Sequence, residues 1–229
     1  MRELAGVSPP DTDLCAATTE YVERVAPPFL LHHVLRSYVY AHWIGRDRGL
    51  SYDAEALYVA TVLHDLGLTS LAGVQARFEL EGADLAREFL AARGMSEPRL
   101  ELVWDAIALH TTAEIPLRKS PEIMLCHLGI GADIRGLPPA LAARMPTREL
   151  LEELPWLGLD DALLDALVGL YRKSPAAAGS HAVADACERR VAGFRRFSLC
   201  DILLERARRD VVPASSPSGA LSPPEASDR

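Results

Sequence analysis

The stretch from residue 57 to residue 69, LYVATVLHDLGLT, constrains the fold more than any other part of the chain. An apolar run, which predicts a helix buried in the core, ends in His64 and Asp65. Gly67 follows and is expected to stop this helix in a left-handed cap. A carboxylate in apolar surroundings is costly unless it is paired or coordinated. The stretch therefore predicts either a pair of metal ligands, or a hydrogen-bonded core histidine beside an aspartate that caps the next turn.

The rest of the chain shows helical periodicity without sustained alternation of β-branched residues, so we predict an all-α fold. The helix that carries His64 is expected to begin at Ser51 or Asp53. Ser120 and Pro121 form a typical helix start, and two prolines at 138 and 139 are expected to break the chain. Further helices are expected over residues 14–25, 29–45, 77–93, 98–111, 120–135, 148–153, 160–171, 181–194 and 200–208.

Three segments are predicted along the chain. Residues 1–27 should form a loose arm and a short helix, and residues 28–210 a single helical domain. Residues 211–229 are rich in Pro, Ser, Ala and acidic residues, a composition that predicts a disordered tail.

Composition narrows the class of protein. The 229 residues, 49% of them hydrophobic and 24% charged, are enough for one domain with a sizeable core. A net charge of −8 argues against nucleic acid or an anionic membrane as partner, and no apolar run reaches the roughly 18 residues of a membrane span. We expect a small-molecule substrate, and a homodimer is compatible with the sequence.

Cysteine usage and the N-terminus indicate the compartment. The four cysteines are widely spaced and form no CxxC pair, which predicts free thiols in a reducing environment. The N-terminal residues lack the apolar segment of a secretory signal, so a cytoplasmic protein is expected.

Asp133 is the most informative carboxylate outside the opening stretch. In the helix expected over residues 120–135 it shares a face with Cys126 and Ile130, so its side chain is aimed at the core. An error in the helical phase, which Gly129 and Gly131 would permit, is the alternative.

The histidines elsewhere are less decisive. His110 lies on the apolar stripe of residues 103, 106 and 107, where a lone histidine is more often a hydrogen-bonded core residue than a ligand. His32 and His33 are adjacent, and periodicity does not choose between them. Two histidines and two aspartates on three helices would suit Zn²⁺, Fe²⁺, Mn²⁺ or Ni²⁺ and disfavour a structural zinc site with thiolate ligands.

These residues carry a resemblance to a known family. The order His33-x-x-Arg36, His64-Asp65 and then Asp133 resembles the HD-domain metal-hydrolase superfamily, an all-helical fold. The phrases HDLGLT (64–69), RFELEGAD (77–84), AIALHT (106–111) and LGIGAD (128–133) are similar to the cyanamide hydratase branch, over roughly residues 29–204. The resemblance implies one metal bound by His33, His64, Asp65 and Asp133. It favours His33 because the first ligand stands three residues before an arginine.

Two departures from the wider superfamily refine this interpretation. Dinuclear members place a second-metal histidine four residues before a Gly-Ala pair, but Phe78 occupies that position here. Leu68 stands where many phosphohydrolases carry a lysine. The sequence therefore favours one metal and a small neutral substrate. Phe78, Trp104 and Arg36 are expected to contact it, with ordinary core packing as the alternative for Trp104.

The resemblance implies a mononuclear hydratase or hydrolase that adds metal-bound hydroxide to a nitrile-like carbon, as in the conversion of cyanamide to urea. Zinc is the expected metal and iron the alternative. His110 would protonate or orient the substrate nitrogen, Asp65 would bind metal and accept a water proton, and Thr111 would donate a hydrogen bond. The alternatives are a metal-dependent phosphohydrolase of a nucleotide or other phosphoester, and a non-catalytic HD-like protein that binds a metabolite or partner.

Overall fold

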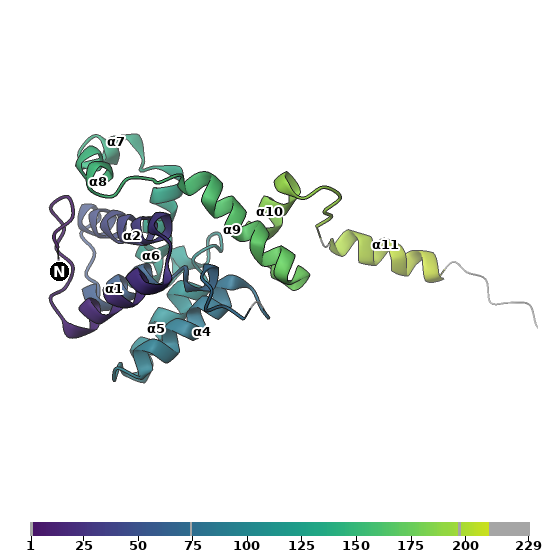
Figure 1. The fold of residues 1–229 in the computed structure, drawn as a ribbon, viewed down its shortest axis with the longest axis horizontal. Coiled ribbons are helices and arrows are strands. Elements are labelled where there is room, and N and C mark those ends of the chain that lie inside the picture. Colours follow the sequence, from purple (N-terminus) through teal and green to yellow (C-terminus); the bar gives the residue numbers. More distant parts are fainter. Residues whose placement is uncertain (1, 74, 197, 211–229) are drawn as a thin grey trace, which may run out of the picture. The chain divides into compact units, whose positions relative to one another are not determined.

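A computed structural model describes residues 2–73, 75–196 and 198–210, and its regular elements in these ranges are helices apart from one isolated bridge (Figure 1). The all-α prediction is confirmed. None of the described helices has the length and apolar character to cross a membrane. The α-helices are α1 Asp13–Val25, α2 Pro28–Asp47, α3 Ala54–Leu63, α4 Phe78–Ala91, α5 Glu97–Ala108, α6 Pro121–Arg135, α7 Pro139–Ala142, α8 Thr147–Glu153, α9 Leu159–Lys173, α10 His181–Arg190 and α11 Leu199–Asp210. Single 3₁₀ turns form η1 Leu66–Leu68, η2 Pro116–Arg118 and η3 Pro175–Gly179.

The chain divides into two compact units, residues 1–194 and residues 195–229. The boundary lies before the predicted start of the tail, and α11 belongs to the second unit. The disordered tail predicted from residue 211 lies outside the described residues.

The N-terminal residues differ from the loose arm that the sequence predicts. Leu4 and Val7 are buried in the main hydrophobic cluster and form an antiparallel bridge through their backbone groups. Thr12 then caps α1 by accepting a hydrogen bond from the Cys15 amide at 3.2 Å. Arg2 and the Ala5 amide also contact the Glu153 carboxylate, so this short segment is attached to the core by apolar and polar contacts.

Helices α2 and α6 share the most extensive interface of the first unit, and Figure 1 shows them side by side. Gly129 permits this approach, because a Cβ atom there would lie 2.3 Å from the Ser37 carbonyl oxygen and 2.6 Å from Ala41 Cβ. Tight packing of α2 against α6 brings His33 and Asp133 together.

The opening stretch folds somewhat differently from its prediction. Helix α3 ends at Leu63, and His64 is its C-cap. Gly67 does not adopt the positive φ of a left-handed cap; it lies in η1, where a Cβ would be 1.9 Å from the Phe78 carbonyl oxygen. Glycine is therefore needed here for close contact between η1 and α4, not to end the helix.

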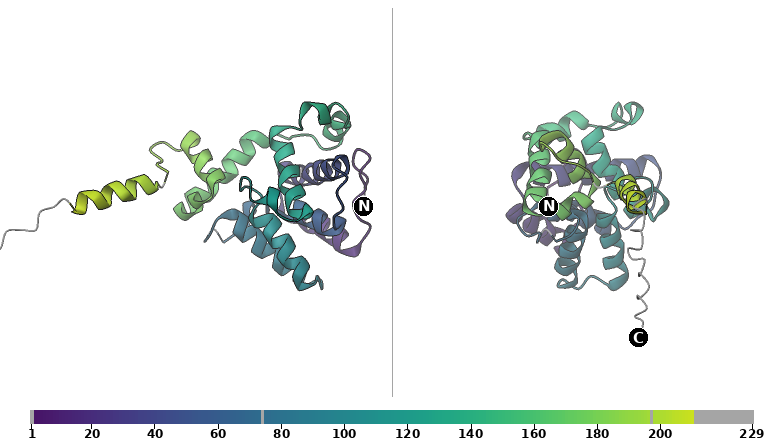
Figure 2. Two further views of the ribbon diagram at one scale, coloured as in Figure 1. Left: turned by 180° about the vertical axis from the view of Figure 1, so that it is seen from behind. Right: turned by 90° about the vertical axis from the view of Figure 1, so that its right-hand side faces the viewer.

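Two further pairs of helices belong to the first unit. Helices α4 and α5 pack against each other, and α9 and α10 pack against each other in the same unit (Figures 1 and 2). Most predicted helices are found within two residues of the expected ends, but the turn α7 forms at the two prolines where a break was expected, and α10 ends at Arg190, not at residue 194. Ser120 makes no capping hydrogen bond with its side chain.

The close contact between α2 and α6 can be tested with two glycine substitutions. Gly129→Ala should lower the free energy of unfolding by about 1–3 kcal/mol, the usual cost of overpacking a core. Gly169→Ala, in the middle of α9 with no atom within 4 Å of the added carbon, should raise it by about 0.5–1 kcal/mol. Urea denaturation measures both values, and equal stabilisation by the two variants would contradict the described interface.

Candidate metal centre

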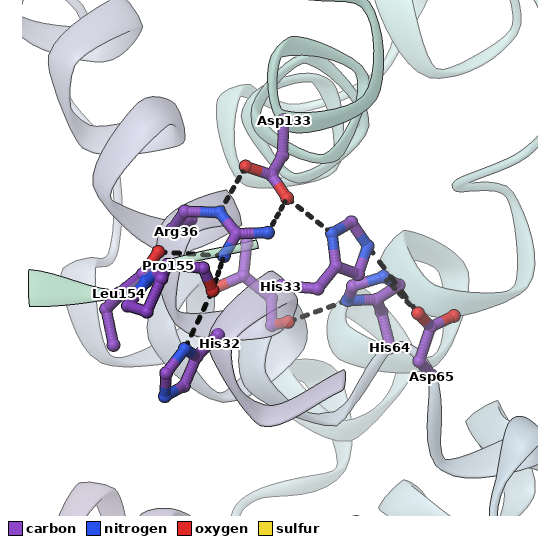
Figure 3. A network of polar contacts seen from close by, with 9 residues as sticks. His32, His33, Arg36, His64, Asp65, Asp133, Leu154 and Pro155 are labelled. Atoms are coloured by element: carbon purple, nitrogen blue, oxygen red, sulfur yellow. Dashed lines mark hydrogen bonds and ion pairs between the residues drawn. The ribbon is translucent and has the colours of Figure 1, made fainter. Parts of the chain in front are cut away.

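His33, His64 and Asp65 meet in the interior of the first unit. Each offers a ligand atom within 4.8 Å of the others, and their exposed fractions are 2%, 0% and 5%. Asp65 Oδ2 lies 3.6 Å from His33 Nε2 and 3.1 Å from His64 Nε2. Figure 3 shows the two imidazoles between the ends of the Asp133 and Asp65 side chains. The structure thus brings three of the four predicted metal ligands together.

Hydrogen bonds fix which ring nitrogen of each histidine carries the proton. His64 Nδ1 lies 2.8 Å from the Thr61 carbonyl oxygen, and His33 Nδ1 lies 2.7 Å from Asp133 Oδ2. Carbonyl and carboxylate oxygens accept hydrogen bonds, so each Nδ1–H must donate. In a neutral ring the opposite nitrogen, Nε2, then has a free lone pair. Both lone pairs face the cluster.

The donor set fits a divalent cation. His64 Nε2 is buried and has no hydrogen-bond partner, although it lies near the Asp65 carboxylate. Two imidazole lone pairs and a carboxylate that face one another are satisfied by a transition-metal ion. The outward hydrogen bonds of His33 and His64 are those that orient metal-bound histidines. An all-N/O set agrees with the metals expected from the sequence, with zinc or iron among them.

The pKa values of His64 and Asp65 also show that this cluster favours a positive charge. Burial opposes the protonated form of His64, but the charge and hydrogen bond of Asp65, the Thr61 carbonyl and the Asp133 charge together outweigh burial and raise the pKa of His64. Burial likewise opposes the ionised form of Asp65, yet His64 above all, and then His33 and His110, lower its pKa. A positive charge between these groups, either a proton on an imidazole or a bound cation, therefore keeps Asp65 a carboxylate in the core.

Asp133 contacts the Nδ1 side of His33, which faces away from Asp65. Its Oδ1 accepts a hydrogen bond from Arg36 Nε at 2.7 Å, and its Oδ2 accepts from Arg36 Nη2 at 2.9 Å as well as from His33. Arg36 is fully buried, and its Nη1 donates to the carbonyl oxygens of Leu154 and Pro155 (Figure 3). Both Asp133 oxygens are thus engaged, and its role as a metal ligand stays a prediction.

Two predictions near this network are corrected or resolved. Arg36 was expected to contact substrate, but its guanidinium faces Asp133 and backbone carbonyls inside the protein, so it is a structural residue. His32 Nδ1 lies 2.9 Å from the Pro155 carbonyl oxygen, away from Asp65. The choice of His33 over its neighbour is therefore the one that the structure supports.

His110 joins the cluster from the end of α5. Its Nδ1 donates to the Ile107 carbonyl oxygen at 2.6 Å, and its Nε2 lies 3.9 Å from Asp65 Oδ1. Burial, reinforced by the neighbouring His64, lowers the pKa of His110 to about 4. The ring is neutral near pH 7 and its Nε2 can accept a proton. The predicted role of His110, to protonate or orient the substrate nitrogen, stays a prediction.

Glu79 is a buried carboxylate that the sequence analysis missed. Its Oε1 accepts hydrogen bonds from Thr111 Oγ at 2.5 Å, Ser180 Oγ at 2.8 Å and Arg77 Nη2 at 3.2 Å. Burial opposes its ionised form, but hydrogen bonds from Thr111, from its own backbone and from Arg77, together with the His110 charge, outweigh that effect and lower the pKa of Glu79. A signal was present, since the residues four and seven positions later are alanines on the same buried face. The Thr111 hydroxyl is committed to this carboxylate, which leaves it as a positioning group.

A cavity of about 340 Å³ opens onto the cluster. Phe78, His110 and Thr111 line it, and their roles toward a substrate stay predictions. Trp104 does not line it: its side chain donates to Asp84 Oδ1 at 2.8 Å and lines a separate groove. Trp104 is therefore withdrawn as a substrate contact. The complete lining is His33, His64, Asp65, Leu68, Phe78, His110, Thr111, His127, Ile130, Gly131, Ile134, Arg135, Leu163, Leu167, Ala182 and Asp185.

Comparison with protein families gives a match over the part of the chain that carries the cluster. A family model described as HD domain matches residues 30–151, which is more than half of the chain. No curated protein matches the sequence. The matched range contains His33, His64, Asp65, His110 and Asp133, whereas α9 and α10 follow it in the sequence.

Metal binding can be tested by removing one imidazole. His64→Ala should abolish tight binding of a divalent ion, because two protein ligands remain where the wild type has three. His42→Ala is the matched control, since His42 is a half-buried histidine that bonds to Tyr52 and is not part of the cluster. Elemental analysis after gel filtration should give about one metal per chain in the control and almost none in His64→Ala. Equal metal content in both would refute the site.

Asp133→Asn separates the two roles open to that residue. If Asp133 orients His33 from behind, the variant should still bind one metal, with an affinity reduced by about 10–100-fold. If it is a direct ligand, binding should be lost as in His64→Ala. Competition with a chromogenic chelator gives the affinity. The arrangement of Asp133 behind His33 predicts the first result. Complete loss of binding in a variant whose circular dichroism shows that it still folds would contradict it.

Proposed function

Because the chain belongs to the HD-domain family, whose members are generally metal-dependent hydrolases, we propose that it hydrates a small nitrile-like substrate. The reference reaction is the conversion of cyanamide to urea. The sequence resemblance and the largely apolar lining of the cavity support this class of substrate. The cluster of His33, His64 and Asp65 supports the catalytic chemistry.

The main support for this proposal is a largely apolar cavity whose lining includes the imidazole nitrogens of His33 and His64 and the Asp65 carboxylate. Leucine, isoleucine and phenylalanine side chains form much of the wall, and Arg135 is the one Lys or Arg side chain among the described residues that line it. A neutral electrophile suits such a wall better than a phosphoester, which needs several cations or donors. His33, His64 and Asp65 would hold a divalent ion, whose Lewis acidity lowers the pKa of water toward about 7.

His110 supplies the proton transfer. Its Nε2 is unprotonated at neutral pH, so it accepts the proton of the attacking water as the oxygen bonds to the nitrile carbon. One carbon–nitrogen π bond breaks and its electron pair goes to nitrogen, which receives that proton from His110. These steps give an imidic acid, in which carbon carries a hydroxyl group and a C=NH group. Transfer of the hydroxyl proton to nitrogen then gives the amide, so that one water molecule is added in total. Asp65 Oδ1, 3.9 Å from His110 Nε2, stabilises the transiently protonated ring.

Phe78 fills the place where dinuclear relatives carry another histidine. Its ring packs edge-on against His110, with 5.7 Å between the ring centroids. An apolar side chain there keeps His110 free of a second ion and excludes water from one side of the imidazole. This contact supports a mononuclear site in which His110 handles protons.

The direct test is incubation of purified, metal-loaded protein with cyanamide, with urea measured over time. Urea formation that depends on the metal supports the proposal. His110→Ala should then lower the rate by about 10²–10⁴-fold, the usual contribution of a general acid or base. Its metal content and melting temperature should stay close to those of wild type. Loss of metal in step with loss of rate would show that His110 is a ligand.

Phosphoester hydrolysis is the second candidate, favoured by one observation. The Arg135 guanidinium folds back across Gly131, where an added Cβ would lie 2.2 Å from Nη2, and so it faces the cavity rim. An anionic group could bind there. A panel of nucleotides and phosphomonoesters, tested with wild type and Arg135→Gln, distinguishes the two candidates. Turnover of a phosphoester that falls at least tenfold in Arg135→Gln, without cyanamide turnover, would favour this second function.

A further inference from the structure

Helices α9 and α10 form a wall of the cavity although they lie outside the matched HD range. Leu163 and Leu167 from α9, and Ala182 and Asp185 from α10, line the space above the metal cluster. Residues inside the matched range therefore form the metal cluster at one end of the cavity. Leu163, Leu167, Ala182 and Asp185 belong to a segment that follows this range.

This wall is held in place by apolar packing. Phe78, at the start of α4, belongs to a buried cluster with Leu167 and Val168 of α9 and with Val183 of α10. Phe78 also packs against His110, so one side chain contacts both the proton-handling residue and the added helices. Through Phe78, the position of α9 and α10 is therefore fixed relative to His110.

A buried hydrogen bond supplies the second attachment. Ser180, just before α10, donates to Glu79 Oε1 at 2.8 Å, and neither residue is exposed. Thr111, next to His110, donates to the same oxygen. Glu79 therefore joins the beginning of α10 to the segment that carries His110. A polar contact of this kind, made in the interior, fixes the position of the wall more sharply than apolar contact alone.

The size of the cavity exceeds what the reference reaction requires. A volume of about 340 Å³ lies at the lower end of the roughly 300–1,000 Å³ found for pockets that enclose small organic ligands. Cyanamide has three non-hydrogen atoms and would contact only a part of the wall. Leu68, Phe78, Leu163 and Leu167 would remain beside water, although burying such groups is the main source of affinity for apolar ligands.

We propose that the substrate carries an uncharged apolar group, of the size of a phenyl ring or a branched alkyl chain, that packs on α9 and α10. Leu163, Leu167 and Ala182 are then the residues that determine specificity, and the reactive carbon lies at the metal cluster. This inference rests on the proposed function and deepens it, because it replaces cyanamide by a larger relative of the same chemistry.

Binding of two nitriles of different size to metal-loaded, full-length protein tests the inference. Fluorine NMR titration gives the dissociation constant of para-fluorobenzonitrile, and acetonitrile, the small comparator, is titrated in competition with it. The aromatic nitrile should bind at least about tenfold more tightly, as expected when an apolar pocket accommodates several additional carbons.

Three variants assign that preference to the wall. Leu163→Ala should weaken binding of the aromatic nitrile by about tenfold, since it removes apolar contact at one position. Ala182→Trp should weaken it further, because the added ring fills the space between the two helices and the floor. His181→Trp is the control: His181 is the exposed neighbour of Ala182 and does not line the cavity, so binding should be unchanged. Melting temperatures identify any variant whose wall is disrupted.

The outcomes separate this inference from the proposed function. Tight, wall-dependent binding without turnover of any nitrile would contradict the proposed function and uphold the apolar wall. Metal-dependent turnover of cyanamide with equal binding of the two nitriles would uphold the function and overturn the inference. Wild-type affinity for the aromatic nitrile in Leu163→Ala and Ala182→Trp would overturn it as well. If Ala182→Trp does not fold, Leu163→Ala and the comparison of the two nitriles decide the matter.

Discussion

The buried ion pair between Arg36 and Asp133 is the interaction on which the rest of the site depends. Two charged groups removed from water are costly, and they are stable here because the pair is bidentate and further hydrogen bonds satisfy the remaining atoms. Loss of either partner would leave an uncompensated buried charge, at a cost of about 3–5 kcal/mol. The pair also joins α2 to α6 and, through Arg36, to the segment that follows α8. It therefore fixes the relative positions of the elements that carry His33 and Asp133.

The chemistry of the cluster follows from this pair. With both oxygens anchored by Arg36, Asp133 presents a fixed acceptor to His33 Nδ1, and this sets the proton on the outer side of the ring. Backbone carbonyls do the same for His64 and His110. Three imidazoles consequently turn unprotonated nitrogens toward one carboxylate. Such a group of acceptors needs a cation, and the fold supplies it with a cavity for substrate on one side.

Part of this arrangement could be predicted from sequence because it is local. An apolar run that ends in His64-Asp65 and a carboxylate on an apolar helix face are both visible as conflicts between burial and charge. Glu79 shows the same conflict and could have been found. The helices themselves follow from periodicity, which is why their ends are nearly all within two residues of the structure.

Other features depend on residues far apart in the chain and could not be predicted in this way. Arg36 pairs with a carboxylate 97 positions later, so its burial was not visible. Trp104 follows Val103, and one helical step of about 100° turns it from the stripe of His110 to a different groove. The wall formed by α9 and α10 requires tertiary contacts with Phe78 and Glu79. Local sequence pattern thus predicts the metal-binding cluster better than the cavity wall formed by α9 and α10.

The most direct test of the central claim is X-ray absorption spectroscopy of the metal-loaded protein. The metal should have a shell of nitrogen and oxygen atoms at about 2.0–2.2 Å, with the outer-shell scattering of at least two imidazoles and no sulfur. Burial raises the pKa of Cys126, which agrees with the absence of a thiolate ligand. A sulfur shell near 2.3 Å, or a metal with no imidazole scattering, would contradict the assignment of His33, His64 and Asp65 as the metal site.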